Sequence, residues 1–265
     1  MPKVDGVGHG EFTGRKMETL TSIFDMHLVI TQEVLNNHRT WGQVYKYIDA
    51  TAGKGFVPET TIPGSPLVFL KCVNSSKIYM PYSAHFIEQS QLNIGELKQN
   101  FYDQSKIHNW KTENCVEFYL GDYSQILPLL LGSFNDRELG LVFIDHSGDL
   151  PIFDTIIEIS NLRPKMEILL YLSARNIKRL YHLNHKSLLD YMQKISKKNW
   201  LIQKPVKWDN LEWTFLLGSN TDIFKDYRKI DFFRLDSDEA QSFFPKLNLT
   251  SKERMERIQP KLPHM

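Results

Sequence analysis

Four short apolar runs of this sequence each end at an acidic residue, and this pattern constrains the fold more than any other feature. The runs are 44–48, 83–87, 116–120 and 139–144, and the acids are Asp49, Glu88, Asp122 and Asp145. Each run is short enough to be a buried strand, and the stretches between the runs carry apolar residues at helical spacing. Strands that alternate with helices form a parallel sheet, in which all strands end at one edge. We therefore expect the four acids to lie in a row along a crevice at that edge.

The same alternation predicts an α/β fold with a mostly parallel sheet. The expected strands are 44–49, 83–87, 116–120, 139–144 and 166–172, and the expected helices are 16–37, 67–73, 91–102, 123–131, 151–162 and 175–197. Two further apolar runs, 200–206 and 211–217, are joined at Trp208–Asp209–Asn210 and predict a hairpin. This hairpin would give the sheet an antiparallel edge.

Length and composition suit a single globular domain. The 265 residues are 42% hydrophobic with a net charge of +1, so the whole molecule has no strong electrostatic attraction to nucleic acid or membranes. We expect a flexible N-terminal arm over residues 1–14, one domain over 15–250 and a tail over 251–265. Cys72 and Cys115 lack the spacing of a metal site, which favours a reduced, cytoplasmic protein without a bound metal.

A turn of small residues, Ala50 to Gly55, follows the first acid. In open α/β sheets ligands bind where the strands end and the strand order reverses, and glycines there let a ligand approach the backbone closely. The turn and the acids are therefore a candidate binding site. The alternative is that the polar residues only mark the points at which strands leave the core.

Several segments together resemble class I methyltransferases and, within them, the three-Cys-motif partner proteins. They are Y-I-D-A-T-A-G-K-G at 47–55, G-S-P-L at 64–67, F-I-E at 86–88, G-D at 121–122, V-F-I-D-x-x-G at 142–148 and L-E-W-T-F-L-L-G-S-N at 211–220. The resemblance covers residues 13–220. It implies a Rossmann-like, seven-stranded sheet with helices on both faces, and S-adenosylmethionine as the cofactor.

With this cofactor, the positions at the strand ends suggest roles for individual residues. Cofactor contacts are expected from Asp49, Ala50, Thr51, Ala52, Gly53, Gly55, Ser65, Glu88, Asp122, Tyr123 and Asp145. Among these, Glu88 would bind the ribose hydroxyls and Asp122 the adenine amine, while Asp145 would lie where the methyl group leaves. Asp145 and His146 are the candidate catalytic residues, because histidine titrates near neutral pH. The alternative for His146 is a polar loop residue that makes one hydrogen bond.

The four residues Asp145 to Gly148 depart from the family pattern, in which Asp-Pro-Tyr-Gly or a similar sequence is usual. Enzymes that methylate the amino group of a base use an aromatic residue here to stack on the flipped base. That aromatic residue is absent from Asp-His-Ser-Gly. A different acceptor, or a lost activity, therefore remains open.

Positive charge gathers after the fifth expected strand, with nine basic residues and one acid between residues 175 and 207. Such clusters bind phosphate backbones, and interleaved aromatic residues stack on bases. The expected substrate-binding residues are Arg175, Lys178, Arg179, Lys197 and Lys198. The alternative is a solvated helix face beside the aromatic core of the hairpin.

The sequence thus favours an S-adenosylmethionine-dependent methyltransferase that acts on a DNA or RNA base, so that nucleic acid is the expected partner. Two alternatives stay open. One is a cofactor-binding partner protein without transfer activity of its own, and the other is a methyltransferase for a protein or a small molecule.

Overall fold

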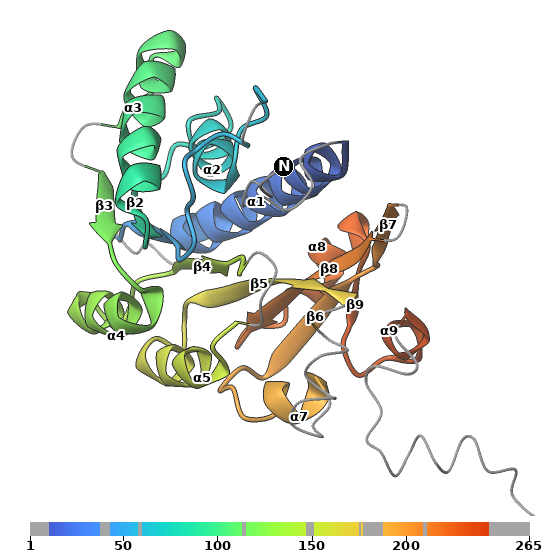
Figure 1. Cartoon of the computed structure of the whole chain (residues 1–265). Coiled ribbons are helices and arrows are strands. Elements are labelled where there is room, and N and C mark those ends of the chain that lie inside the picture. The colour runs from blue at the N-terminus through green and yellow to red at the C-terminus, as the bar shows by residue number, and fades with distance from the viewer. Residues whose placement is uncertain are drawn as a thin grey trace, which may run out of the picture.

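The computed structural model describes residues 11–37, 43–57, 60–112, 115–146, 151–174, 176, 188–208 and 211–243 (Figure 1). The strands are β1 (Tyr45–Asp49), β2 (Tyr82–Glu88), β3 (Val116–Leu120), β4 (Gly140–Ile144), β5 (Glu167–Ser173), β6 (Asn199–Gln203), β7 (Val206–Trp208), β8 (Leu211–Ser219) and β9 (Phe232–Arg234). The helices are α1 (Glu11–Asn37), α2 (Ser65–Val73), α3 (Gln91–His108), α4 (Tyr123–Ser133), α5 (Phe153–Leu162), α7 (Leu188–Met192), α8 (Phe224–Tyr227), the 3₁₀ helix η1 (Arg228–Ile230) and α9 (Asp238–Phe243).

The strands form one twisted sheet in the order β3-β2-β1-β4-β5-β8-β6-β9, with β7 paired to β8. The five strands β1 to β5 are mutually parallel, and β8 is antiparallel to β5. The predicted Rossmann-like α/β fold is therefore confirmed. The described strands number nine rather than seven, because the short β7 and β9 extend the sheet beyond the expected set.

The C-terminal strands close the sheet out of sequence order. β8 lies between β5 and β6, with Phe215 opposite Tyr171 and Leu217 opposite Leu201. The long β8 is buried on both sides of the sheet from Trp213 to Ser219. It is thus a central strand, and the predicted antiparallel hairpin contributes core rather than an exposed edge.

Two hydrophobic layers cover the two faces of the sheet. Side chains alternate along a strand, so Leu141 and Phe143 of β4 face one layer while Val142 and Ile144 face the other. In Figure 1, α1, α2 and α3 lie above the sheet and α4, α5 and α7 below it. A strand covered on both faces is apolar throughout, as the fully buried β4 is.

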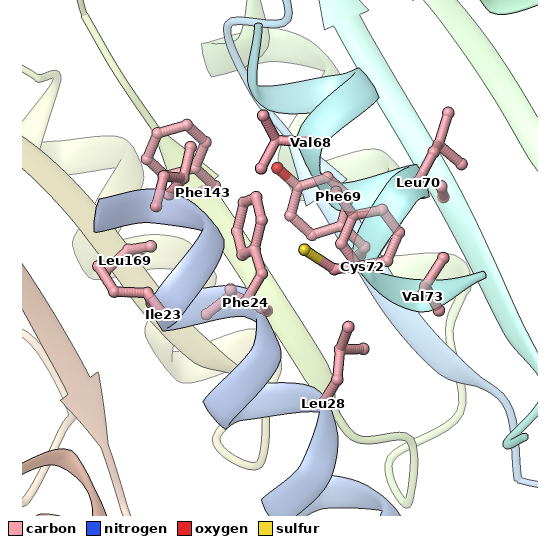
Figure 2. Close-up of a cluster of buried hydrophobic side chains, with 14 of the residues drawn as sticks. Ile23, Phe24, Leu28, Val68, Phe69, Leu70, Cys72, Val73, Phe143 and Leu169 are labelled. Atoms are coloured by element: carbon pink, nitrogen blue, oxygen red, sulfur yellow. The ribbon is translucent and has the colours of Figure 1, made fainter. Parts of the chain in front are cut away.

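The helix α1 is held against the sheet by aromatic packing (Figure 2). The Phe24 ring meets the rings of Tyr47, Phe69 and Phe143 edge-on, with centroids 5.3, 5.7 and 6.2 Å apart. Fully burying one such side chain contributes about 1.5–3 kcal/mol to stability. This packing fixes α1 over β1 and β4, and so fixes where the residues of its first turns lie.

Several sequence-based boundaries differ from the structure. Helix α1 begins at Glu11, so residues 11–14 belong to the helix and not to a flexible arm. Helix α3 continues to His108, beyond the expected end at residue 102. Residues 193–197 are not helical, because α7 ends at Met192. Residues 1–10 and the predicted tail 251–265 lie outside the described residues. No helix of the described chain is long and apolar enough to span a membrane.

Candidate functional site

A pocket of about 400 Å³ lies at the edge where the parallel strands end. Its lining residues are Ala50, Thr51, Gly53, Glu88, Gln89, Asn93, Gly121, Asp122, Tyr123, Asp145, His146 and Ile152. They follow β1, β2, β3 and β4, the strands on both sides of the point where the strand order reverses. The volume is within the range of small-ligand sites, about 300–1,000 Å³.

The loop after β1 is fixed to both neighbouring strands by its backbone. The N–H of Ala50 donates to the carbonyl of Phe143 at 2.9 Å, and the N–H of Ala52 donates to that of Ile87 at 2.9 Å. Gly53 then turns the chain with φ at +63°, a conformation that side chains disfavour. The loop is therefore rigid backbone that passes along the pocket floor.

Glu88 ends β2 and joins three parts of the pocket. Its Oε2 accepts the N–H of Gly53 at 2.9 Å, and its Oε1 accepts the N–H of Ser90 at 2.8 Å. The Asn93 side chain is a weaker donor to Oε1 at 3.5 Å. A carboxylate has about four lone-pair sites, and the three donors leave one of them open, on Oε2. Glu88 is thus held in place with acceptor capacity left for a ligand.

Asp49 does not line the pocket, although it was predicted to contact the cofactor. Its side chain is fully buried below the loop, where it accepts the N–H of Thr51 at 3.2 Å and the hydroxyl of Tyr47 at 3.3 Å. Ser65 is its third partner. Burial raises the pKa of this carboxyl from 3.8 to about 7, against the hydrogen bonds, which lower it. Asp49 shapes the loop from beneath.

Asp122 and Tyr123 are at the pocket as predicted. The Oδ1 of Asp122 accepts the N–H of Ser124 at 2.8 Å and so caps the N-terminus of α4. The Tyr123 hydroxyl accepts the N–H of Ile152 at 2.9 Å, and the His146 ring stands edge-on to the Tyr123 ring at 5.8 Å. Asp122 therefore has a structural role and one oxygen free of the cap.

Asp145 follows β4 and is paired with a residue that sequence reasoning missed. Its N–H donates to the Thr51 hydroxyl at 2.9 Å, and its Oδ2 forms a buried ion pair with Lys16 of α1. The Lys16 ammonium also lies 3.7 Å from the centre of the Tyr171 ring. The Oδ1 of Asp145 is buried and has no hydrogen-bond partner within the described part of the chain. One oxygen of this pocket carboxylate is thus unused.

Three other predicted cofactor residues lie away from the pocket lining. Ala52 is buried, and the Gly55 carbonyl accepts the N–H of Gly64 at 2.7 Å. Ser65 is buried beside Asp49, and Gly64, not Ser65, is the N-cap of α2. Ala52 and Gly55 are thus part of the loop without lining the pocket, and Ser65 supports the loop through Asp49. The lining residues that were missed are Gln89, Asn93, Gly121 and Ile152. Gln89 follows Glu88 directly and Gly121 precedes Asp122, so their adjacency to predicted residues was a signal in the sequence.

The predicted basic substrate site has little support from the described residues. Lys197 is buried, and its ammonium donates to the carbonyls of Arg163, Pro164 and Met166 at 3.4, 3.0 and 2.6 Å. Lys198 is exposed, but it precedes β6 at the edge where the parallel strands begin, opposite the pocket. Both lysines are therefore removed from the candidate substrate site. Arg175, Lys178 and Arg179 lie outside the described residues.

The pocket is acidic in character. Glu88, Asp122 and Asp145 line it, and none of its described lining residues is a lysine or an arginine. Carboxylates repel the phosphates of a dinucleotide and favour ligands that carry hydroxyl donors or positive charge. No group of three metal-binding side chains occurs among the described residues. These carboxylate acceptors therefore fit the adenosine diol and the sulfonium of S-adenosylmethionine.

Comparisons with known proteins support the fold but do not identify a reaction. No family model matches the chain, and no curated protein sequence matches it. Protein LPL1258 from Legionella pneumophila (family model DUF519) is similar in structure, with a TM-score of 0.52, 14% identity, and coverage of 83% of this chain and 91% of that chain.

Two further solved structures show weaker likeness. The putative methyltransferase YhhF from Escherichia coli has a TM-score of 0.41 and 14% identity, covering 83% of this chain and 92% of that chain. A putative rRNA-methylase from Clostridium thermocellum has a TM-score of 0.41 and 9% identity, covering 71% of this chain and 95% of that chain. At such identities structural likeness speaks to the fold alone. The chain has the Rossmann-like α/β fold that it shares with the Legionella protein.

Proposed function

We propose that this protein is an S-adenosylmethionine-dependent methyltransferase of class I. The observation that carries the proposal is the row of three carboxylates around one pocket at the strand-order reversal. In this arrangement Glu88 binds the ribose hydroxyls with the oxygen capacity left over from Gly53 and Ser90. Asp122, which lines the same pocket, would accept from the adenine amine. The resemblance to the three-Cys-motif partner proteins in the motifs at these strand ends agrees with the proposal.

The cofactor, when bound, supplies a methyl group already activated on sulfur. The chain's own task is to align the acceptor and to exclude water. Asp145 is the proposed hydrogen-bond acceptor for the acceptor group, because it lines the pocket and its buried Oδ1 has no hydrogen-bond partner among the described residues. His146 is the proposed route for the departing proton, since it lines the pocket beside Asp145.

The proposed acceptor is a base of DNA or RNA. The support is positional: β5 ends at Ser173, at the same edge of the sheet as the pocket, and Arg175, Lys178 and Arg179 follow it directly in the chain. These three cations would bind the phosphates of such a substrate, with an affinity that falls steeply with salt. A protein or small-molecule acceptor, or a partner protein without transfer activity, is the competing function.

Calorimetry with S-adenosylmethionine and S-adenosylhomocysteine tests cofactor binding. We expect Glu88→Gln to weaken both ligands about 30-fold or more, because hydrogen bonds to a charged group contribute roughly 1.5–3 kcal/mol each. The matched control is Glu138→Gln, which removes an acid paired with Lys46 at 3.3 Å, near the start of β4 and away from the pocket. Equal affinities in wild type and Glu88→Gln would refute the assignment.

Radiolabelled methyl transfer then identifies the acceptor. The protein is incubated with labelled cofactor and, separately, with DNA, RNA and a protein extract. Label in a nucleic-acid pool that disappears in Asp145→Ala is the expected outcome. Label in the protein pool would overturn the nucleic-acid assignment but keep the enzyme, whereas cofactor binding without label in any pool would favour the partner protein.

A further inference from the structure

The ion pair between Lys16 and Asp145 joins a remote helix to the pocket. Lys16 lies in the first turns of α1, 129 residues before its partner, and only 8% of its surface is exposed. The aromatic face of Tyr171 lies under the same ammonium. Lys16 is not among the described lining residues, while Asp145 is. The lysine therefore reaches the carboxylate from behind the pocket wall.

The charge on Asp145 acts on the groups around it. It contributes to the raised pKa of Asp49 and to that of Tyr171, although burial is the larger cause in both. The groups that face it are Lys16, Asp49, Tyr171 and His146. Lys16 is its one described salt-bridge partner. Whether the pocket presents a net negative charge at this point thus depends on the lysine.

We propose that Lys16 is a positioning and charge-compensating residue for Asp145, and that this ion pair sets how strongly the pocket prefers a sulfonium ligand over the neutral thioether. The inference rests on the proposed function, since it concerns the same cofactor. Lys16 pairs with Oδ2 and cancels most of the carboxylate's charge, while the buried Oδ1 has no partner among the described residues. With the charge of Asp145 compensated, the pocket prefers S-adenosylmethionine over the product S-adenosylhomocysteine only moderately.

The test is the ratio of two dissociation constants, that of S-adenosylhomocysteine divided by that of S-adenosylmethionine, measured by calorimetry at pH 8. One unit charge at about 10 Å and an effective dielectric constant of about 20 changes a binding constant roughly tenfold. Lys16→Met should therefore raise the ratio about tenfold, because it leaves Asp145 uncompensated. Lys16→Arg keeps the charge and should keep the ratio within about twofold of wild type.

The chain offers a matched control in Lys46. Its side chain is likewise largely buried, with 14% of its surface exposed, and its ammonium pairs with Glu138 at 3.3 Å and lies 4.9 Å from the Phe134 ring centre. It stands near the start of β1, at the opposite edge of the sheet. Lys46→Met should cost stability without changing the ratio, which separates a charge effect in the pocket from a general loss of packing.

Asp145→Asn provides a second arm should Lys16→Met not fold. This variant leaves the lysine uncompensated, so the ratio should fall about tenfold, and the double variant Lys16→Met with Asp145→Asn should restore it. A folded Lys16→Met protein with the wild-type ratio would overturn the inference alone, and so would an Asp145→Asn protein with an unchanged ratio. Absence of binding of both ligands to wild type would overturn the proposed function as well.

Discussion

The buried carboxyl of Asp49 predicts an unusual dependence of stability on pH. Burial raises its pKa from 3.8 to about 7 in the folded protein. Between these values the folded state keeps a proton that the unfolded chain has released. The free energy of unfolding therefore falls as pH rises from about 4 to about 7. A shift of about three units corresponds to roughly 4 kcal/mol in total.

Asp49→Asn is the perturbation that isolates this contribution. Asparagine has the shape of the protonated acid, so its oxygen still accepts the N–H of Thr51 and its amide donates toward Ser65 or Tyr47. The variant and wild type should be about equally stable near pH 4. Near pH 8 the variant should be more stable, by up to roughly 4 kcal/mol. Other titrating groups cancel in the difference between the two proteins.

The assay is urea unfolding followed by circular dichroism at several pH values from 4 to 8. Asp222→Asn is a control that should show no such trend, because hydrogen bonds from Arg234 hold the pKa of that exposed carboxyl below its usual value of 3.8. Its titration therefore lies below this pH range, and the difference between this variant and wild type should stay nearly constant from pH 4 to 8. A difference between wild type and Asp49→Asn that stays flat with pH would refute the reasoning.

The other predictions concern a lysine and two glycines. Lys197→Met should lower the free energy of unfolding by about 2–4 kcal/mol, because three carbonyls lose their hydrogen-bond donor. Nucleic-acid binding should stay unchanged. A stable variant that no longer binds RNA would contradict this prediction. Gly140→Ala should cost at least about 3 kcal/mol in urea unfolding, because its Cβ would lie 1.9 Å from the Lys46 carbonyl oxygen. Gly53→Ala should lower the free energy of unfolding by only about 1–2 kcal/mol, because the added Cβ has no atom within 4 Å and only the positive φ is unfavourable. Equal losses of stability in the two glycine variants would contradict this reasoning.

Much of the sheet could be predicted because its signals are local. The run 116–120 is β3 as expected, and β1, β2, β4 and β5 differ from the predicted strands by a residue or two. An apolar run followed by an acid marks a strand end whatever lies beside it in space. The position of β8 between β5 and β6 and the added strand β9 depend on long-range pairing, which no local pattern in the sequence encodes.

The residues that line the pocket were largely predictable from the sequence, whereas the buried residues that hold them in place were not. Glu88, Asp122 and Asp145 line one pocket as their positions at strand ends suggested. Asp49 obeys the same pattern, yet its side chain turns inward to Tyr47 and Ser65, and the pattern cannot distinguish these directions. Lys16 was missed because its partner is 129 residues away. Lys197 was misassigned because a count of charges does not reveal burial.

The most direct test of the account is a crystal structure of the protein with S-adenosylhomocysteine bound. We predict that the ligand occupies the pocket after β1, β2, β3 and β4, with its ribose hydroxyls within hydrogen-bonding distance of Glu88 and its sulfur on the Asp145 side. A ligand found elsewhere on the sheet, or a ribose that leaves Glu88 bonded only to Gly53 and Ser90, would contradict the central claim.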